Sequence, residues 1–171
     1  MDTTELASRI REVAYLEGDF TLRSGLKSRY YLDKYLFETQ PDVLGELARR
    51  FVPHCADANR VAGAELGGVP LAAAVSLAAG KPFVIVRNAK KGYGTSKMYE
   101  GALNPGDRVV LLEDVTTTGG QILEAARTLA DAGAEVVRIV AVIDRGTAGA
   151  AIESAGYAFE SLLSKQDLGI A

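Results

Sequence analysis

The chain has 171 residues, a length that suits one domain with a sizeable hydrophobic core. Its hydrophobic content of 48% and charged content of 24% exclude a disordered or fibrous protein, and a net charge of −3 gives no general reason to expect a nucleic-acid partner. No apolar run approaches the roughly 20 residues that a membrane-spanning helix needs. Cys55 is the only cysteine, so an intrachain disulfide is excluded and we expect a cytoplasmic protein.

Residues 1–60 are expected to form a hood over the rest of the chain. The elements predicted there are a helix and two strands, Thr3–Leu16, Asp19–Leu22 and Arg29–Asp33. A second helix should begin at Pro41, because proline suits the first helical position. We expect this hood to belong to a single domain, residues 1–171, and not to fold alone.

Residues 61–171 alternate between short β-branched runs and Ala-rich helical segments. The strands predicted are Val61–Leu66, Phe83–Arg87, Arg108–Asp114, Val136–Asp144 and Tyr157–Leu163. The helices predicted between them are Val69–Ala79, Gly120–Ala132 and Thr147–Ala155. Nearly continuous apolar strands joined by helical crossovers are typical of an α/β fold, so we expect a doubly wound, mostly parallel sheet flanked by helices.

The strongest functional signal follows the apolar run at Val109–Leu112. It consists of the carboxylates Glu113 and Asp114, a Thr/Gly turn and then a predicted helix. Ligands of open α/β sheets gather at the carboxyl ends of strands, and backbone N–H groups at a helix N-terminus suit a phosphate. The carboxylates would repel that phosphate and must face sugar hydroxyls, a cation or a developing positive charge. The pattern therefore predicts a site for a ribose 5-phosphate derivative. A turn that only caps the helix is the structural alternative, but it would not require two carboxylates.

A basic loop follows the predicted strand Phe83–Arg87. Four basic residues and no acidic residue lie between Arg87 and Tyr99, and several glycines interrupt the stretch. Long loops of this kind often serve as lids, and a cationic lid would stabilise a negatively charged leaving group and exclude water. A solvated basic loop, or a weak contact with nucleic acid, is the alternative.

The acidic pair and its turn resemble the ribosyl pyrophosphate motif of the type I phosphoribosyltransferases. The resemblance implies that Glu113 and Asp114 contact the ribose hydroxyls of phosphoribosyl pyrophosphate, with Asp114 as a catalytic residue. It also implies that the turn holds the 5-phosphate. The turn residues implied are Val115, Thr116, Thr117, Thr118, Gly119, Gly120 and Gln121.

The basic loop resembles that of the orotate phosphoribosyltransferases. The resemblance implies that Arg87, Lys91 and Tyr93 contact the pyrophosphate, with Lys91 as the principal catalytic residue and Lys90 as a helper. Many family members have Lys directly after the Arg, whereas this chain has Asn88, which removes one expected contact. Tyr93 replaces a common His and cannot titrate near neutral pH.

Two further segments are similar to the orotate enzymes. In the hood, the resemblance implies that Arg23 reaches the activated sugar and that Tyr30 and Tyr31 border the base, although core packing would also explain the tyrosines. At the end of the next strand, Arg145 would grip the carboxylate of orotate, a task that suits a planar bidentate donor. Thr117 would touch the base. A surface Arg145 bonded to Asp144 is the ordinary alternative.

The resemblance implies transfer of phosphoribosyl from phosphoribosyl pyrophosphate to orotate, giving orotidine 5′-monophosphate and pyrophosphate on the path to UMP. It further implies Mg²⁺ held mainly by the substrate, with no direct protein ligand, and a homodimer that shares the lid between subunits. One rival is a phosphoribosyltransferase for another base. A second rival is a regulator that senses phosphoribosyl pyrophosphate on the same fold and binds nucleic acid, but the acidic composition argues against a basic binding face.

Overall fold

The computed structural model describes residues 1–22, 25–89 and 97–170. Its strands are β1 (Tyr15–Thr21), β2 (Lys27–Leu32), β3 (Arg60–Ala64), β4 (Phe83–Val86), β5 (Tyr99–Glu100), β6 (Arg108–Thr116), β7 (Glu135–Asp144) and β8 (Phe159–Ser164). Its helices are α1 (Thr3–Ala14), α2 (Lys34–Glu38), α3 (Pro41–Phe51), the 3-10 turn η1 (Val52–Cys55), α4 (Gly68–Ala79), α5 (Gly120–Asp131) and α6 (Ala148–Ser154). None of these helices is long and apolar enough to cross a membrane.

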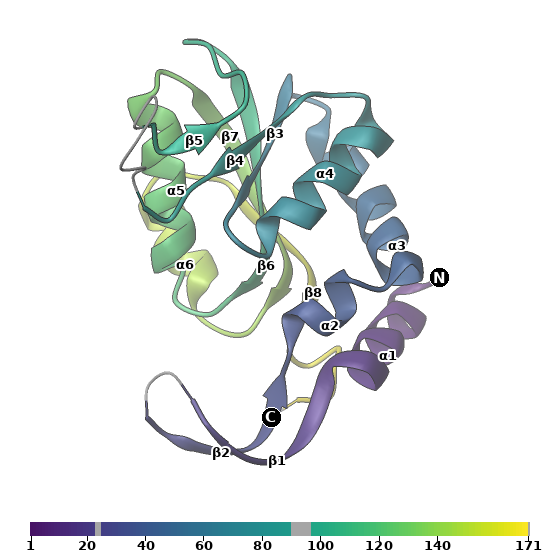
Figure 1. Ribbon diagram of the computed structural model, residues 1–171. Coiled ribbons are helices and arrows are strands. Elements are labelled where there is room, and N and C mark those ends of the chain that lie inside the picture. Colours follow the sequence, from purple (N-terminus) through teal and green to yellow (C-terminus); the bar gives the residue numbers. More distant parts are fainter. Residues whose placement is uncertain (23–24, 90–96, 171) are drawn as a thin grey trace.

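A six-stranded sheet in the order β5-β4-β3-β6-β7-β8 forms the centre of the molecule (Figure 1). All neighbouring strands are parallel except the edge pair β4 and β5. One apolar cluster joins α1, α3 and α4 to one face, and a second joins α5 and α6 to the other. The predicted doubly wound α/β fold is confirmed. β6 lies in the interior of the sheet with helices on both faces, which buries its residues Val109–Leu112 completely.

The hood differs from its prediction at the first helix. α1 ends at Ala14, and Tyr15 and Leu16 already pair with Leu32 and Tyr31 of β2. Cross-strand pairing therefore overrides the helical pattern at these two residues. The hairpin extends from one end of the sheet (Figure 1), and Tyr15 and Tyr30 at its base pack against the main core.

Two short elements were absent from the prediction. α2 spans only five residues; the Asp33 carboxylate accepts a hydrogen bond from Tyr35 N at 3.1 Å, and Phe37 is fully buried. β5 spans two residues, at the edge of the sheet. Elements this short show no periodicity in the sequence, because their stability comes from capping and tertiary packing.

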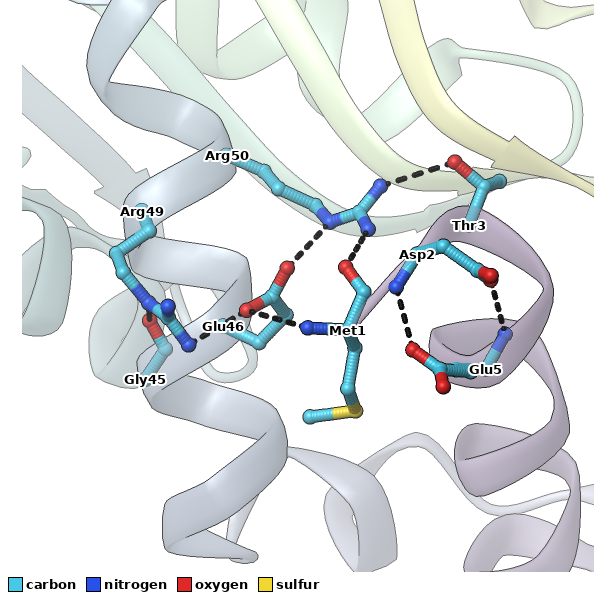
Figure 2. Close-up of polar contacts among 8 residues, drawn as sticks. All are labelled: Met1, Asp2, Thr3, Glu5, Gly45, Glu46, Arg49 and Arg50. Carbon is cyan, nitrogen blue, oxygen red and sulfur yellow. Dashed lines mark hydrogen bonds and ion pairs between the residues drawn. The ribbon is translucent and has the colours of Figure 1, made fainter.

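Buried Glu46 of α3 anchors the N-terminus of the chain (Figure 2). Its carboxylate pairs with Arg50 at 2.9 Å and Arg49 at 2.5 Å, and lies 3.7 Å from the amino group of Met1. Arg50 also donates to the carbonyl oxygen of Met1 at 2.8 Å. These hydrogen bonds and charges lower the pKa of Glu46, so this carboxylate is ionised and paired.

Candidate active site

The phosphate turn lies between β6 and α5. Gly119 takes φ = +82°, a conformation that favours glycine, and α5 begins at Gly120. No side chain of the described residues caps this helix, so its first N–H groups remain open to an anion. A cavity of ≈ 190 Å³ opens there, lined by Glu113, Val115, Thr116, Thr117, Thr118, Gly119, Gly120, Gln121 and Ile122. The structure therefore brings together the residues predicted for the phosphate.

Thr116 lies on the strand and not in the turn, because β6 continues two residues beyond the predicted end at Asp114. Its buried hydroxyl donates to the Asp144 carboxylate of β7 at 3.0 Å. The side chain of Thr116 thus fixes the start of the turn to the neighbouring strand. Thr117 and Thr118 are exposed, which leaves these two threonines to offer hydroxyl donors to a ligand.

Asp114 is fully buried and forms an ion pair that the sequence did not predict. The ammonium group of Lys34, on α2, lies 2.7 Å from Asp114 Oδ2. Burial lowers the pKa of Lys34, but attraction to Asp114 outweighs burial and raises it overall. Lys34 is therefore a cation held against the carboxylate that the resemblance assigns to the ribose.

Glu113 is half-buried beside Asp114 and lines the phosphate cavity. Burial, reinforced by repulsion from Asp114, raises the pKa of Glu113 to about 8. Two neighbouring carboxyls in such a setting resist carrying two full negative charges at once. A ligand that offers hydroxyl groups or positive charge would relieve this repulsion.

Gly67, in the turn before α4, approaches Asp114 closely. A Cβ atom at this position would lie 1.7 Å from Asp114 Oδ2, a distance that no side chain permits. We expect Gly67→Ala to displace the carboxylate and to weaken binding of phosphoribosyl pyrophosphate by roughly tenfold or more. Isothermal titration calorimetry would measure the change. Gly45→Ala is the matched control, because a Cβ there meets nothing within 4 Å and alanine favours the helix; equal affinities of the two variants would contradict the prediction.

The basic loop is described only at its two ends. Lys90, Lys91 and Tyr93 lie outside the described residues, as does Arg23 of the hood. Arg87 Nη1 lies 3.7 Å from Glu65 and 3.6 Å from Glu100. Arg87 also borders a pocket that includes Gln121 of the phosphate turn, so the base of the loop adjoins the predicted phosphate site.

Asn88, which stands where many orotate enzymes have Lys, binds the turn that follows β3. Its backbone N–H donates to the Glu65 carboxylate at 3.0 Å, and its side-chain amide donates to the Glu65 carbonyl at 3.1 Å. Asn88 therefore ties the start of the basic loop to the segment next to Gly67. A lysine at this position would keep the backbone N–H bond, but its long, flexible stem would not hold a donor at the Glu65 carbonyl as the short amide side chain does.

The structure brings Arg145 and Tyr30 together. Arg145 Nη2 donates to the Tyr30 hydroxyl at 3.1 Å, and the guanidinium lies 5.9 Å from the ring centroid. Asp144, the alternative partner of Arg145, instead accepts from Thr116 and Gly146. The Arg145 backbone N–H donates to Thr116 O at 2.9 Å, which places this group beside the phosphate turn.

The two tyrosines occupy different settings. Tyr30 stacks on Tyr15 with 5.2 Å between ring centroids, so packing accounts for part of its position. Tyr31 is 44% exposed, and its ring lies 5.7 Å from that of Phe20. Tyr30 thus joins the predicted base site through Arg145, whereas Tyr31 faces outward along the hairpin.

The sequence and fold of this chain are similar to those of known proteins. The phosphoribosyl transferase domain model matches residues 56–161. Orotate phosphoribosyltransferase of Methanocella arvoryzae is 44% identical over 96% of this chain and 96% of its own length, and that of a Nocardioides species is 45% identical over 100% and 96%. The crystal structure of Mycobacterium tuberculosis orotate phosphoribosyltransferase with phosphoribosyl pyrophosphate is 33% identical. It covers 99% of this chain and 100% of its own chain, with a TM-score of 0.85.

Proposed function

Because this chain belongs to the orotate phosphoribosyltransferases, we propose that its acidic pair, phosphate turn and basic loop form one site for phosphoribosyl pyrophosphate. The reaction transfers the 5-phosphoribosyl group to orotate and releases pyrophosphate. The full-length similarity to orotate phosphoribosyltransferases carries this conclusion. It favours orotate over another base and an enzyme over a regulator.

The N–H groups of the turn and of α5 bind the 5-phosphate, and Thr117 and Thr118 add hydroxyl donors. Asp114 and Glu113 accept hydrogen bonds from the ribose hydroxyls. Positive charge develops on the ribose ring as the bond to pyrophosphate breaks, and the nearby carboxylates stabilise that charge. Lys91 stabilises the negative charge on the departing pyrophosphate, with Arg87, Lys90 and Tyr93 as further contacts.

Orotate binds next to Arg145 and Tyr30. The guanidinium offers two parallel N–H groups to the carboxylate of the base, while its contact with the Tyr30 hydroxyl holds it in place. Thr117 contacts the base from the turn, and Arg23 completes the hood side of the site, whereas the exposed Tyr31 is assigned to the hood surface and not to the base. The ring nitrogen of orotate then attacks the anomeric carbon as pyrophosphate leaves.

Mg²⁺ fits this arrangement as an ion carried by the substrate. The described residues contain no group of three or more His, Cys, Asp or Glu side chains that could hold a metal, yet they offer two carboxylates at the cavity. The pyrophosphate and the ribose hydroxyls would hold the ion, and the acidic pair would hold those hydroxyls. When bound, the ion neutralises charge on the leaving group.

The chain is proposed to act as a cytoplasmic homodimer whose basic loop serves the neighbouring subunit. Exposed apolar side chains on the hood and α2, which include Leu26, Tyr31, Tyr35 and Leu36, support a partner surface in that region. The single cysteine, Cys55, is a free thiol, which is compatible with the proposed reducing compartment. Sedimentation equilibrium of the purified protein would test the dimer.

Base consumption by purified protein tests the proposed reaction. Orotate, uracil, hypoxanthine and adenine are offered separately with phosphoribosyl pyrophosphate and Mg²⁺. Turnover of orotate alone is the expected result. Turnover of another base would keep the sugar phosphate site and overturn the base site, and tight binding of phosphoribosyl pyrophosphate without turnover would favour a sensor.

Arg145→Ala is expected to lower kcat/KM for orotate by about 10²-fold, because a charged, bidentate contact is lost, while the KM for phosphoribosyl pyrophosphate changes little. Initial rates with each substrate varied in turn would separate the two effects. Arg138→Ala, at a half-buried position of β7 where the side chain pairs with Glu160 and Asp57, is the arginine control. Equal losses for both substrates in Arg145→Ala would place this residue outside the base site.

A further inference from the structure

Glu38, the last residue of α2, is a buried carboxyl group with no role in the mechanism given above. It is 1% exposed, and neither of its carboxyl oxygens accepts a hydrogen bond from any donor in the described part of the chain. A buried carboxylate without donors is costly, whereas a buried carboxylic acid can donate its own proton. The surroundings of Glu38 therefore favour the neutral acid.

Glu38 points at Asp114. A Cβ atom built on Gly67 would meet Asp114 Oδ2 at 1.7 Å and Glu38 Oε1 at 2.9 Å, so both oxygens flank the same point. Asp114 Oδ2 accepts no hydrogen bond from the described residues, although Lys34 pairs with it at 2.7 Å. A carboxylate oxygen that can accept a further hydrogen bond beside its ion pair and a carboxyl that can donate one thus lie side by side.

Burial and the two neighbouring carboxyls raise the pKa of Glu38, and only Lys34 among the named causes opposes them. Burial is the main reason why the pKa of Glu38 rises, repulsion by Asp114 adds to it, and together they bring it to about 9 against the opposing attraction of Lys34. Glu113 of β6 adds a smaller repulsion. The other helices that contact α2 contribute apolar side chains to the shared core, namely Leu6, Ile10, Val43 and Leu47, while Arg9 and Asp42 pair with each other at 2.9 Å.

We propose that Glu38, as the neutral acid, donates a hydrogen bond to Asp114 and is the residue that positions this carboxylate for the ribose. Asp114 is then held from one helix by two different groups, the Glu38 acid and the Lys34 ammonium. The two groups lie four residues apart, on one face of α2. Since α2 directly follows β2, the hood and the acidic pair are joined through this helix. The inference rests on the proposed role of Asp114 in binding phosphoribosyl pyrophosphate.

Thermal unfolding from pH 5 to pH 9, at fixed protein concentration, tests the protonation of Glu38. In the unfolded chain Glu38 ionises near its ordinary pKa, while in the folded chain it keeps its proton. The contribution of Glu38 to the free energy of unfolding therefore falls with each rise in pH across this window, in addition to the contribution of Glu113, which the wild type and the variant share. Glu38→Gln removes the contribution of Glu38 and keeps a hydrogen-bond donor. The unfolding temperature of the variant, measured relative to that of the wild type, should therefore increase as the pH rises.

Glu46→Gln is the matched control, because Glu46 is also a buried helical glutamate but is paired with cations. The lowered pKa of Glu46 means that its contribution is fully present above the ordinary pKa of glutamate and is lost only at more acidic pH. Glu46→Gln should thus unfold at a lower temperature than the wild type, by an offset that stays nearly constant from pH 5 to pH 9. A constant offset for Glu38→Gln as well would overturn the inference.

Binding of phosphoribosyl pyrophosphate at pH 7 tests the positioning role. Glu38→Gln should bind within about twofold of the wild type, whereas Glu38→Leu, which fills the space without a donor, should bind about tenfold more weakly. Equal affinities of these two variants would overturn the positioning role. Unchanged binding in Asp114→Asn would instead show that the proposed sugar phosphate site is wrong, so the two failures are distinguishable.

Discussion

Replacing Lys91 by alanine is expected to lower kcat by about 10²- to 10³-fold, while the dissociation constant for phosphoribosyl pyrophosphate changes by less than about tenfold. The charge on the departing pyrophosphate oxygen is greatest in the transition state, so a lysine that meets it there contributes more to turnover than to binding. Rapid-quench measurement of a single turnover, together with calorimetric binding, would separate the two quantities.

Lys97→Ala is the matched control for Lys91→Ala. Lys97 belongs to the same basic loop, and its ammonium group lies 5.4 Å from the ring centroid of Tyr99. We expect this variant to keep kcat within about threefold of the wild type, because an exposed cation–π contact contributes only about 0.5–1 kcal/mol. Turnover that survives in Lys91→Ala would show that the assignment of the loop is wrong.

The sequence predicts the central fold well because its strands are marked by their own residues. β6 and β7 each contain an unbroken apolar run, Val109–Leu112 and Ile139–Ile143, and glycines follow α4 and α5. The sequence also marks Glu113, Asp114 and the turn as a candidate site, because these residues interrupt such a run at the carboxyl end of a strand. Local patterns therefore predict the sheet and indicate the residues that line the cavity between β6 and α5.

The partners of the acidic pair could not be predicted in this way. Lys34 and Glu38 reach Asp114 from a helix of five residues that is far away in the sequence, and their meeting depends on how the hood folds over the sheet. The tie between Asn88 and Glu65 is another contact between separate segments. Tertiary packing decides these contacts, and periodicity contains no information about them.

Asp114→Asn is the second variant from which we expect a large loss. The substitution keeps the size of the side chain but removes the charge that is proposed to face the ribose, and we expect kcat/KM for phosphoribosyl pyrophosphate to fall by about 10²- to 10³-fold. The fall should appear in both binding and kcat, because the hydroxyl contacts exist in the ground state and the positive charge grows only in the transition state. Steady-state rates and calorimetric binding would measure the two parts.

A structural explanation for the same loss must be tested separately, because Asp114 is also the counter-ion of Lys34 at 2.7 Å. If Asp114 served only to neutralise Lys34, then Lys34→Met would relieve the unpaired ammonium in Asp114→Asn, and the double variant would recover activity. We expect no such recovery, and we expect Lys34→Met alone to cost less than Asp114→Asn, because the lysine holds the carboxylate whereas the carboxylate meets the substrate. A double-mutant cycle of kcat/KM for phosphoribosyl pyrophosphate decides between the two explanations. Full recovery in the double variant would reduce Asp114 to a structural counter-ion.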